Sequence, residues 1–404
     1  MADKKGQFRG MLLGLAVGDA MGYTIDGSSW KEIQQSYGPN GLLGYDLVNG
    51  YADVTSYTQL AAFTCNGLLL GLTRGQMTGK MLPLFRYVGL SSREWAASQK
   101  PWGRPSTTFC WLLQVPEMCR RHCMDTRMLD ALSRDTLGAM EARFNSSSTP
   151  GSLTSAAAVG LFSHLYKVEQ SELDLLGAEV VALSHGSPLA FLSGAALAHI
   201  ISRSLSAPDL PLKNLVLEAA QSLKNQFGHQ YSQSFEISNL LNLAVSLAED
   251  SRLNPVTAME QLHCLNAAQV LSGAVYACLR CGKSFDTAMI AAVNHSGRSA
   301  AVGAVAGAIL GLRLGEKALP SFYIECLEPA ETLGELAEDM LGGCTMERGS
   351  KLFDLDWDRK YIHGGIKTAP PGGVYPPCSS HRVAARGDFL WANGIGQSFF
   401  WPSR

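Results

Sequence analysis

Residues 10–22 read GMLLGLAVGDAMG, and residues 303–315 read GAVAGAILGLRLG. Each stretch places a glycine at every fourth position, which puts all of these glycines on one face of an α-helix. Glycine in a helix interior costs roughly 1 kcal/mol relative to alanine, so such a stripe requires a compensating gain. Close approach of another helix backbone supplies that gain. We therefore predict that these two helices are central and touch each other; the alternative is chance spacing in a chain with 41 glycines.

Most of the remaining chain also has apolar residues at helical spacing, and no segment alternates convincingly like a strand. The pattern predicts an all-α bundle. Helices are expected within residues 112–129, 153–166, 188–205, 210–227, 235–248, 255–277 and 331–341.

Composition sets the broad class of protein. The chain has 404 residues, of which 46% are hydrophobic and 17% charged, so it can bury a large core. A formal net charge of -2 without a basic tract favours neither nucleic acid nor an anionic membrane surface as a partner. Small molecules or neutral protein surfaces are the expected partners.

Residues 1–9 are polar with mixed charge, and Asp19 soon interrupts the apolar run that follows. We expect neither a secretory signal nor a membrane span there, and hence a cytoplasmic protein.

Ten cysteines in a chain of this kind are expected to be mostly reduced and buried. Two clusters have metal-ligand spacing, Cys119/His122/Cys123 and Cys278/Cys281. Both fall in segments that are expected to be helical, and neither has the second flanking pair of a zinc knuckle. A metal site is therefore the weaker interpretation of both clusters.

The composition changes near residue 345. Residues 368–373 read TAPPGG, Pro376 and Pro377 follow, and residues 399–401 read FFW. Such a segment is not expected to form a regular helix. We predict a helical domain over residues 1–345 and an irregular extension over residues 346–404, either laid against the body through its aromatic side chains or partly disordered.

Five segments resemble motifs of the ADP-ribosylglycohydrolase family, in the family's order, over roughly residues 6–345. Residues 14–22 resemble its GxxxGDAxG helix, after which the family has a glutamate where this chain has Asp26. Residues 292–315 resemble AVNxGGDxDTxxAxxGxxxGxxxG. Residues 55–61, TSYTQLA, stand in the place of TDDTQxA. Residues 151–161 and 184–188 resemble GNGSxMRxxPxGL and SHxHP. The resemblance implies a compact orthogonal multi-helix bundle.

The family's enzymes cleave glycosidic bonds of ADP-ribose with two magnesium ions held largely by carboxylates. Their metal-ligand motifs are degenerate here, because all four aspartates of TDDT and DxDT are replaced. The matching positions hold Thr55, Ser56, Tyr57, Arg298, Ala300 and Ala301. Arg298 is a permanent cation and would repel magnesium. The asparagine and arginine of GNGSxMR correspond to Pro150 and Ser155. We therefore predict that the magnesium cofactors are lost and that no other metal replaces them.

Two acids remain as catalytic candidates. Asp19 and Asp26 could flank a sugar as a pair with different pKa values. The alternative is a structural role, in which one of them pairs with Arg298. Removing the arginine from a buried pair of that kind would lower stability by about 3–5 kcal/mol.

The segment before the second glycine helix is a candidate ligand-binding loop. Its residues are Asn294, Ser296, Gly297, Arg298 and Ser299. Backbone N–H groups at a helix start and a guanidinium suit a phosphate. The alternative is that Ser296 caps the helix while Arg298 pairs with an acid. His185 and His295 are expected to be structural hydrogen-bonding residues.

Three functions follow from these observations. The first is a pseudoenzyme that binds ADP-ribose, a related nucleotide, an ADP-ribosylated ligand or a protein in the former active-site cleft. The second is a hydrolase of ADP-ribosyl bonds without the two-magnesium centre, using Asp19 and Asp26. The third is a structural or interaction protein without a ligand.

Overall fold

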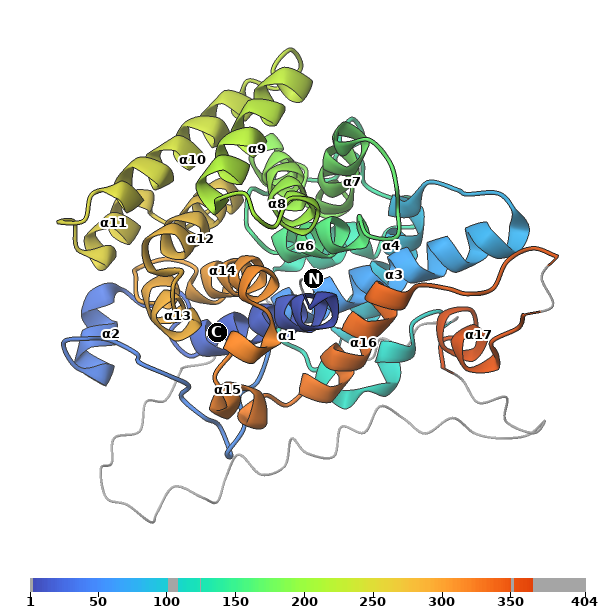
Figure 1. Cartoon of the computed structure of the whole chain (residues 1–404), viewed down its shortest axis with the longest axis horizontal. Helices are drawn as coiled ribbons and strands as arrows, with labels where there is room; N and C mark the ends of the chain where they lie inside the picture. Colours follow the sequence, from blue (N-terminus) through green and yellow to red (C-terminus); the bar gives the residue numbers. More distant parts are fainter. Residues whose placement is uncertain (1–2, 101–107, 124, 350–351, 366–404) are drawn as a thin grey trace. The chain divides into compact units, whose positions relative to one another are not determined.

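The structure, a computed structural model, describes residues 3–100, 108–123, 125–349 and 352–365 (Figure 1). Within these residues the only β-type pairings are two isolated bridges, Val48–Tyr51 and Ala52–Leu327, so the prediction of an all-α fold is confirmed. The α-helices are α1 Lys4–Tyr23, α2 Trp30–Tyr37, α3 Ser56–Thr78, α4 Leu84–Ser98, α5 Thr126–Leu132, α6 Leu153–Phe162, α7 Gln170–Ala182, α8 Pro188–Ser206, α9 Leu212–Phe227, α10 Gln233–Glu249, α11 Pro255–Leu262, α12 Ala267–Cys281, α13 Phe285–Val293, α14 Ser299–Leu314, α15 Ser321–Cys326, α16 Ala330–Gly342 and α17 Leu355–Tyr361. Short 3₁₀ helices cover Trp111–Gln114, Pro116–Cys119 and Glu316–Ala318.

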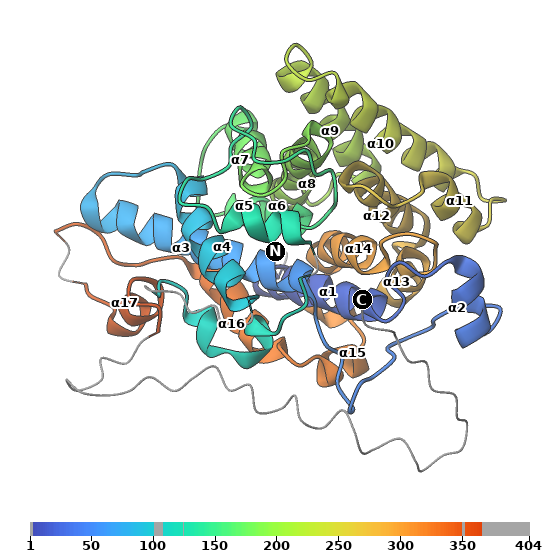
Figure 2. The ribbon, with the colours of Figure 1, turned by 180° about the vertical axis from the view of Figure 1, so that it is seen from behind.

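The two glycine helices, α1 and α14, lie side by side in the middle of the fold (Figures 1 and 2). They run in opposite directions, so Gly14 faces Gly307 and Gly18 faces Gly303. A Cβ atom added at any of these four glycines would lie less than 3.0 Å from the backbone of the facing helix. The predicted contact is therefore confirmed, and only glycine permits it.

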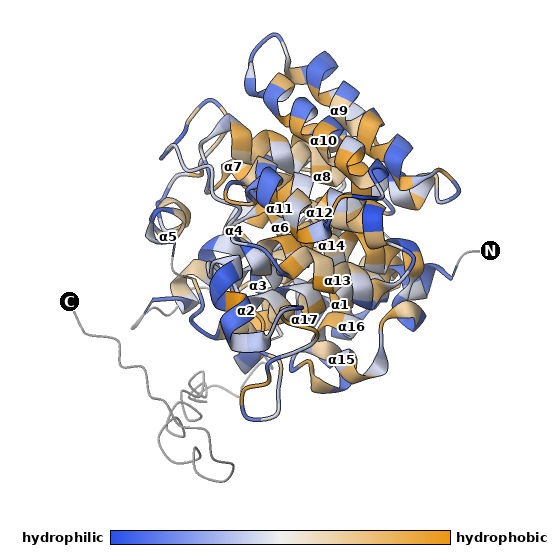
Figure 3. Cartoon of the chain, turned by 90° about the vertical axis from the view of Figure 1, so that its left-hand side faces the viewer, coloured by the Kyte–Doolittle hydropathy of each residue, from blue (hydrophilic) through white to orange (hydrophobic). Residues whose placement is uncertain are grey.

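Other helices surround this pair in successive layers. Helix α3 packs on α4 and α6, and α8 packs on α6, α7 and α9. Figure 3 shows apolar residues concentrated on the central helices and polar residues on the outer faces of α2 and α9. Helix α8 is the one described helix that is long and apolar enough to cross a membrane, and 78% of its apolar window is buried inside the protein. It therefore has the burial of a core helix.

Side-chain caps fix the beginnings of several helices. Ser29 and Glu32 form a capping box at α2, and Asn266 and Gln269 form another at α12. The Thr55 hydroxyl accepts a hydrogen bond from Tyr57 N at the start of α3. This cap places the TSYTQLA segment at a helix N-terminus beside α1.

The predicted bounds of two helices were wrong. Residues 255–277 form two helices, because His263 and Cys264 have positive φ angles of 58° and 50° that end α11. The described residues between 112 and 129 form short 3₁₀ turns, irregular segments and the beginning of α5. Cys119, His122 and Cys123 are consequently not on a common α-helix, contrary to the expectation.

The chain after residue 345 is not wholly irregular, because it contains α17. Tyr361 of this helix is fully buried, and Trp357 Nε1 donates a 2.9 Å hydrogen bond to Thr73 Oγ1 on α3. Lys360 and Tyr361 also bond to Asp339 on α16. The aromatic residues expected to lie on the body, near residues 389–401, are outside the described residues.

Candidate functional site

Asp19, a catalytic candidate, is enclosed by the beginning of α3. Its carboxylate accepts hydrogen bonds from Thr55 N at 2.9 Å, Thr55 Oγ1 at 2.7 Å, Thr58 N at 3.1 Å and Thr58 Oγ1 at 2.6 Å. The residue is 0% exposed, and burial raises its pKa to about 6 despite these four bonds. Asp19 therefore joins the end of α1 to the N-terminus of α3 and is out of reach of a substrate.

Asp26, the second candidate, lies just after α1 and faces the start of α14. Its Oδ1 accepts a 3.1 Å hydrogen bond from Ala300 N, and its Oδ2 lies 3.5 Å from Arg298 Nη1. Burial raises the pKa of this carboxyl, whereas the bond from Ala300 and the charge of Arg298 act against the rise. The Asp26 carboxylate thus lies at the N-terminus of α14, where a negative charge interacts favourably with the helix dipole.

The Arg298 guanidinium has capacity for a further partner. Its side chain is 47% exposed, against 22% for Asp26, and their single contact is long. The structure therefore pairs Arg298 with Asp26 and not with Asp19. An exposed pair of this kind contributes about 0–1 kcal/mol, so the loss of about 3–5 kcal/mol considered for a buried pair does not apply.

Tyr57 projects into the same region from the first turn of α3. Burial raises its pKa, and the neighbouring charges of Asp26 and Arg298 act on it in opposite directions. Its backbone carbonyl accepts a 2.7 Å hydrogen bond from Thr154 Oγ1 on α6. An aromatic side chain thus packs where the family's motif has an aspartate.

The predicted ligand loop begins with two residues held by the surrounding backbone. Asn294 Oδ1 accepts from Leu42 N, and its Nδ2 donates to Leu42 O and Ile290 O, all at 2.8 Å. His295 Nε2 lies 3.0 Å from Ala292 O, and burial lowers the pKa of His295 to about 4. Both side chains therefore stabilise the loop.

Ser296 and Gly297 connect the loop to three other segments. Ser296 Oγ accepts from Trp30 N at 2.8 Å, and Ser296 N donates to Glu260 Oε1 at 2.7 Å. Gly297 O accepts from Gly27 N at 3.1 Å. The Ser296 hydroxyl consequently bonds to the first turn of α2, and not to the helix α14 that it was considered to cap.

Ser299 differs from its neighbours in the loop. It is the first residue of α14 and is fully buried, yet its hydroxyl has no hydrogen-bond partner among the described residues. Arg298 N, by contrast, donates a 2.9 Å bond to Cys264 O. Buried polar atoms are normally paired, so the Ser299 hydroxyl is an exception in this loop. Because Ser299 is 0% exposed, as Asp19 is, its hydroxyl is out of reach of a ligand at the surface.

A charged cluster near Asp53 was missed by sequence reasoning. Arg120 Nη1 lies 2.9 Å from Asp53 Oδ1, and both terminal nitrogens of Arg120 bond to Glu328. His122 Nε2 lies 3.0 Å from Asp53 Oδ2. Burial alone would raise the pKa of Asp53, but the interactions with His122 and Arg120 outweigh this effect, so the pKa of Asp53 is lowered. The His122 ring therefore contacts this cluster of ion pairs. Motif spacing could not have predicted the cluster, because Glu328 is far from Arg120 in the sequence.

His185 belongs to a second network that spacing alone did not reveal. Its Nδ1 lies 2.8 Å from both Ser152 Oγ and Ser184 Oγ, and its Nε2 lies 2.9 Å from Thr149 Oγ1. Thr149 in turn donates to Asp125 at 2.8 Å. Burial lowers the pKa of His185 to about 4, and Ser152 and Ser184 are only 1% and 3% exposed. Serine, histidine and aspartate meet here in the core, where no substrate can reach the serines.

The fold and this polar region together define a class: an all-helical protein with acidic and basic residues gathered where α1, α3 and α14 meet. The ADP-ribosylglycohydrolase family profile matches residues 1–349, and the chain belongs to that family. A solved structure titled "ADP-ribosylglycohydrolase-related protein complex" is similar with a TM-score of 0.54 and 20% identity, over 84% of this chain and 99% of that one. This likeness supports the shared fold. No curated protein matches the sequence.

The residues at the family's metal positions do not fit two magnesium ions. Hard cations require several oxygen ligands, chiefly carboxylates. The replacements supply a serine hydroxyl, a phenol, a guanidinium and alanine methyl groups, and none of them is a carboxylate. Thr55 and Asp19 bond to each other, and Asp26 bonds to Ala300 N. Over the part of the chain that the structure describes, no three His, Cys, Asp or Glu side chains form a group that could hold a metal.

Proposed function

We propose that this chain is a non-hydrolysing member of the ADP-ribosylglycohydrolase family that binds ADP-ribose or a related nucleotide, without magnesium, at Arg298. The main support for this proposal is the exposure of Arg298. Its side chain is 47% exposed, and its guanidinium has one 3.5 Å contact with Asp26. A phosphate there would accept a charge-assisted, bidentate contact from Arg298.

The burial of Asp19 argues against hydrolysis by the two remaining acids. A metal-free glycosidase needs two carboxyl groups that flank the sugar, one as acid and one as base or nucleophile. Asp19 is fully buried with four hydrogen bonds and the Asp26 side chain is 22% exposed, so at most one of the two acids can reach a ligand. The geometry therefore favours binding over turnover. A cytoplasmic location agrees with a nucleotide ligand and stays a prediction.

Calorimetric titration with ADP-ribose, with and without magnesium, tests this function. We expect saturable binding that does not depend on magnesium, no release of ribose or acceptor, and no rise in melting temperature with magnesium alone. Turnover would support a hydrolase instead. No heat of binding in either condition would leave the structural or interaction role.

The variant Arg298→Ala tests the site itself. It should weaken ADP-ribose or inorganic phosphate binding by about tenfold or more, because a charge-assisted contact is lost. The free energy of unfolding should fall by no more than about 1 kcal/mol, since the pair with Asp26 is exposed. Arg252→Ala is the matched control, because that side chain is 91% exposed and, within the described part of the chain, forms an ion pair only with Asp250. Equal affinity of the two variants would refute the site.

A further inference from the structure

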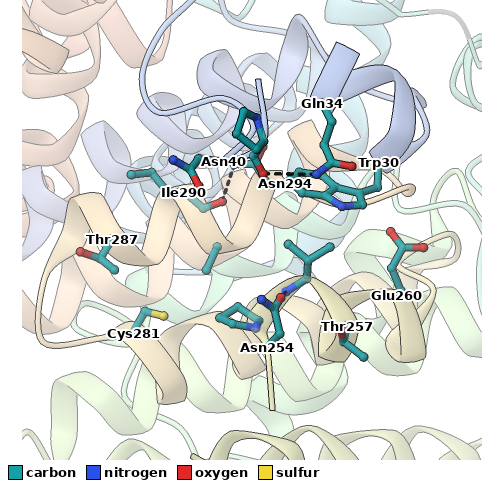
Figure 4. A pocket seen from close by; sticks show the side chains of 14 residues that line it. Trp30, Gln34, Asn40, Asn254, Thr257, Glu260, Cys281, Thr287, Ile290 and Asn294 are labelled. Carbon is teal, nitrogen blue, oxygen red and sulfur yellow. Dashed lines mark hydrogen bonds between the residues drawn. The ribbon is translucent and has the colours of Figure 1, made fainter. Parts of the chain in front are cut away.

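A cavity of about 690 Å³ opens between α2, α11 and α13 (Figure 4). Asn294 of the predicted ligand loop lines it, whereas Asp26 and Arg298 do not. Trp30 and Gln34 line it from α2, Asn254 and Glu260 from the α11 side, and Ile290 from α13. This volume is within the range of about 300–1,000 Å³ that is usual for small-molecule sites. Apolar atoms form most of the exposed wall, although seven of the 14 lining residues have polar side chains.

The charge of this cavity is negative. Glu260 is the one carboxylate among its lining residues, which include no lysine, arginine or histidine. Glu260 Oε1 accepts the hydrogen bond from Ser296 N, and no ion pair of Glu260 occurs in the described structure. Burial raises the pKa of the Cys281 thiol, so this lining group is neutral. A cationic ligand would therefore meet one uncompensated negative charge.

An aromatic ring lines the same cavity as that charge. Figure 4 shows Trp30 and Glu260 at the same end of the cavity, on the two helices that face each other across it. The backbone of Trp30 is fixed by its 2.8 Å hydrogen bond to Ser296 Oγ. Tryptophan is the aromatic side chain that attracts cations best, and its ring also packs against flat apolar groups.

We infer that this cavity binds a small organic cation: a primary ammonium group on a flat apolar body. The ammonium lies beside Glu260 and the Trp30 ring, and the body packs on Ile290. Neither Arg298 nor Asp26 lines the cavity, and the ligand has the opposite charge to ADP-ribose. The inference is therefore independent of the proposed function.

The test compares 2-phenylethylamine, which is protonated at neutral pH, with 2-phenylethanol, which has the same shape without the charge. Calorimetric titration of the full chain should give saturable binding of the amine, with a Kd of about 1 mM or tighter. The alcohol should bind at least about tenfold more weakly, because it lacks the contact with Glu260 and the cation–π interaction.

Two variants locate the binding. Glu260→Gln keeps an oxygen that can accept from Ser296 N, but removes the charge, and should weaken amine binding by about tenfold or more. Glu236→Gln is the control, since Glu236 is an exposed acid on α10 outside the cavity. If Glu260→Gln does not fold, Thr257→Lys serves instead, because Thr257 is exposed at the cavity wall and a lysine there repels a cation.

Equal affinity for the amine and the alcohol would overturn the inference, as would the absence of saturable binding. Equal effects of Glu260→Gln and Glu236→Gln would overturn it too. Arg298→Ala should leave amine binding unchanged, so failure at this cavity is distinguishable from failure at the ADP-ribose site.

Discussion

At the scale of single residues, Asp19 shows how an acid can be retained for its bonds to the backbone. Two hydroxyls and two N–H groups donate to it, which satisfies donors at the start of α3. Complete burial nevertheless disfavours its charge. The raised pKa therefore needs no catalytic role, because structural acids experience the same desolvation.

The raised pKa predicts a specific pH dependence of stability. The folded pKa of about 6 exceeds the ordinary 3.8, so the folded state holds the Asp19 proton more tightly. The contribution of Asp19 to stability is therefore largest below about pH 4 and is lost as the pH rises to about 6, by at most about 3 kcal/mol. Urea denaturation of the wild type and Asp19→Asn at pH 4 and pH 7 measures it.

Asparagine cannot ionise, so the Asp19→Asn variant does not share the loss of stability that the wild type undergoes as the pH rises. The free energy of unfolding of the variant, relative to that of the wild type, should therefore increase between pH 4 and pH 7. A difference between the two proteins that stays constant with pH would contradict this assignment.

The sequence allowed some of these residue contacts to be predicted. A pair between Arg298 and an acid at the end of α1 was one of two alternatives, because the glycine helices bring those segments together. The cluster of Asp53, Arg120 and Glu328 was not predictable, since it depends on how three loops fold back. The buried hydroxyl of Ser299 likewise has no signature in sequence.

At the scale of helices, the glycine stripes were the most informative pattern. Their spacing predicted which two helices meet, because close contact between helix backbones is the main gain that can offset the cost of glycine in a helix. The helix breaks at residues 263–264 were not predictable. Neither residue is glycine or proline, so tertiary packing imposes their positive φ angles.

The variant Gly14→Ala tests the close packing of α1 and α14. Alanine is the better helix former, but its Cβ would overlap the backbone at Gly307, so we expect a loss of about 2 kcal/mol or more. Gly342→Ala in α16 is the matched control, because nothing lies within 4 Å of the added methyl group. Its stability in urea should be unchanged or higher. Similar values for the two variants would show that α1 and α14 are not tightly packed.

At the scale of the whole molecule, the body of the protein extends beyond the region that matches the family. The family match ends at residue 349, whereas α17 contributes the buried Tyr361 and the Trp357 bond to α3. Lys360 also lies 4.3 Å from the centre of the Trp111 ring. Helix α17 therefore covers part of the core. The predicted boundary at residue 345 stays a prediction, because the described segment after it is short.

A chain ending at residue 349 should be less stable than one ending at residue 365. Loss of the Tyr361 side chain alone exposes apolar surface worth about 1.5–3 kcal/mol, and Asp339 loses the partners that Lys360 and Tyr361 provide. Urea denaturation of both chains measures the difference. Equal midpoints and slopes would mean that α17 does not stabilise the core.

The antiparallel contact of α1 and α14 also has a consequence for biosynthesis. Gly18 emerges from the ribosome roughly 300 residues before Gly303, which at about 5–20 residues per second amounts to about 15–60 s. Throughout that interval the apolar helix α1 lacks the partner that completes its packing. We therefore expect a chaperone to bind the nascent chain until α14 has been translated. The last step of folding should then follow translation.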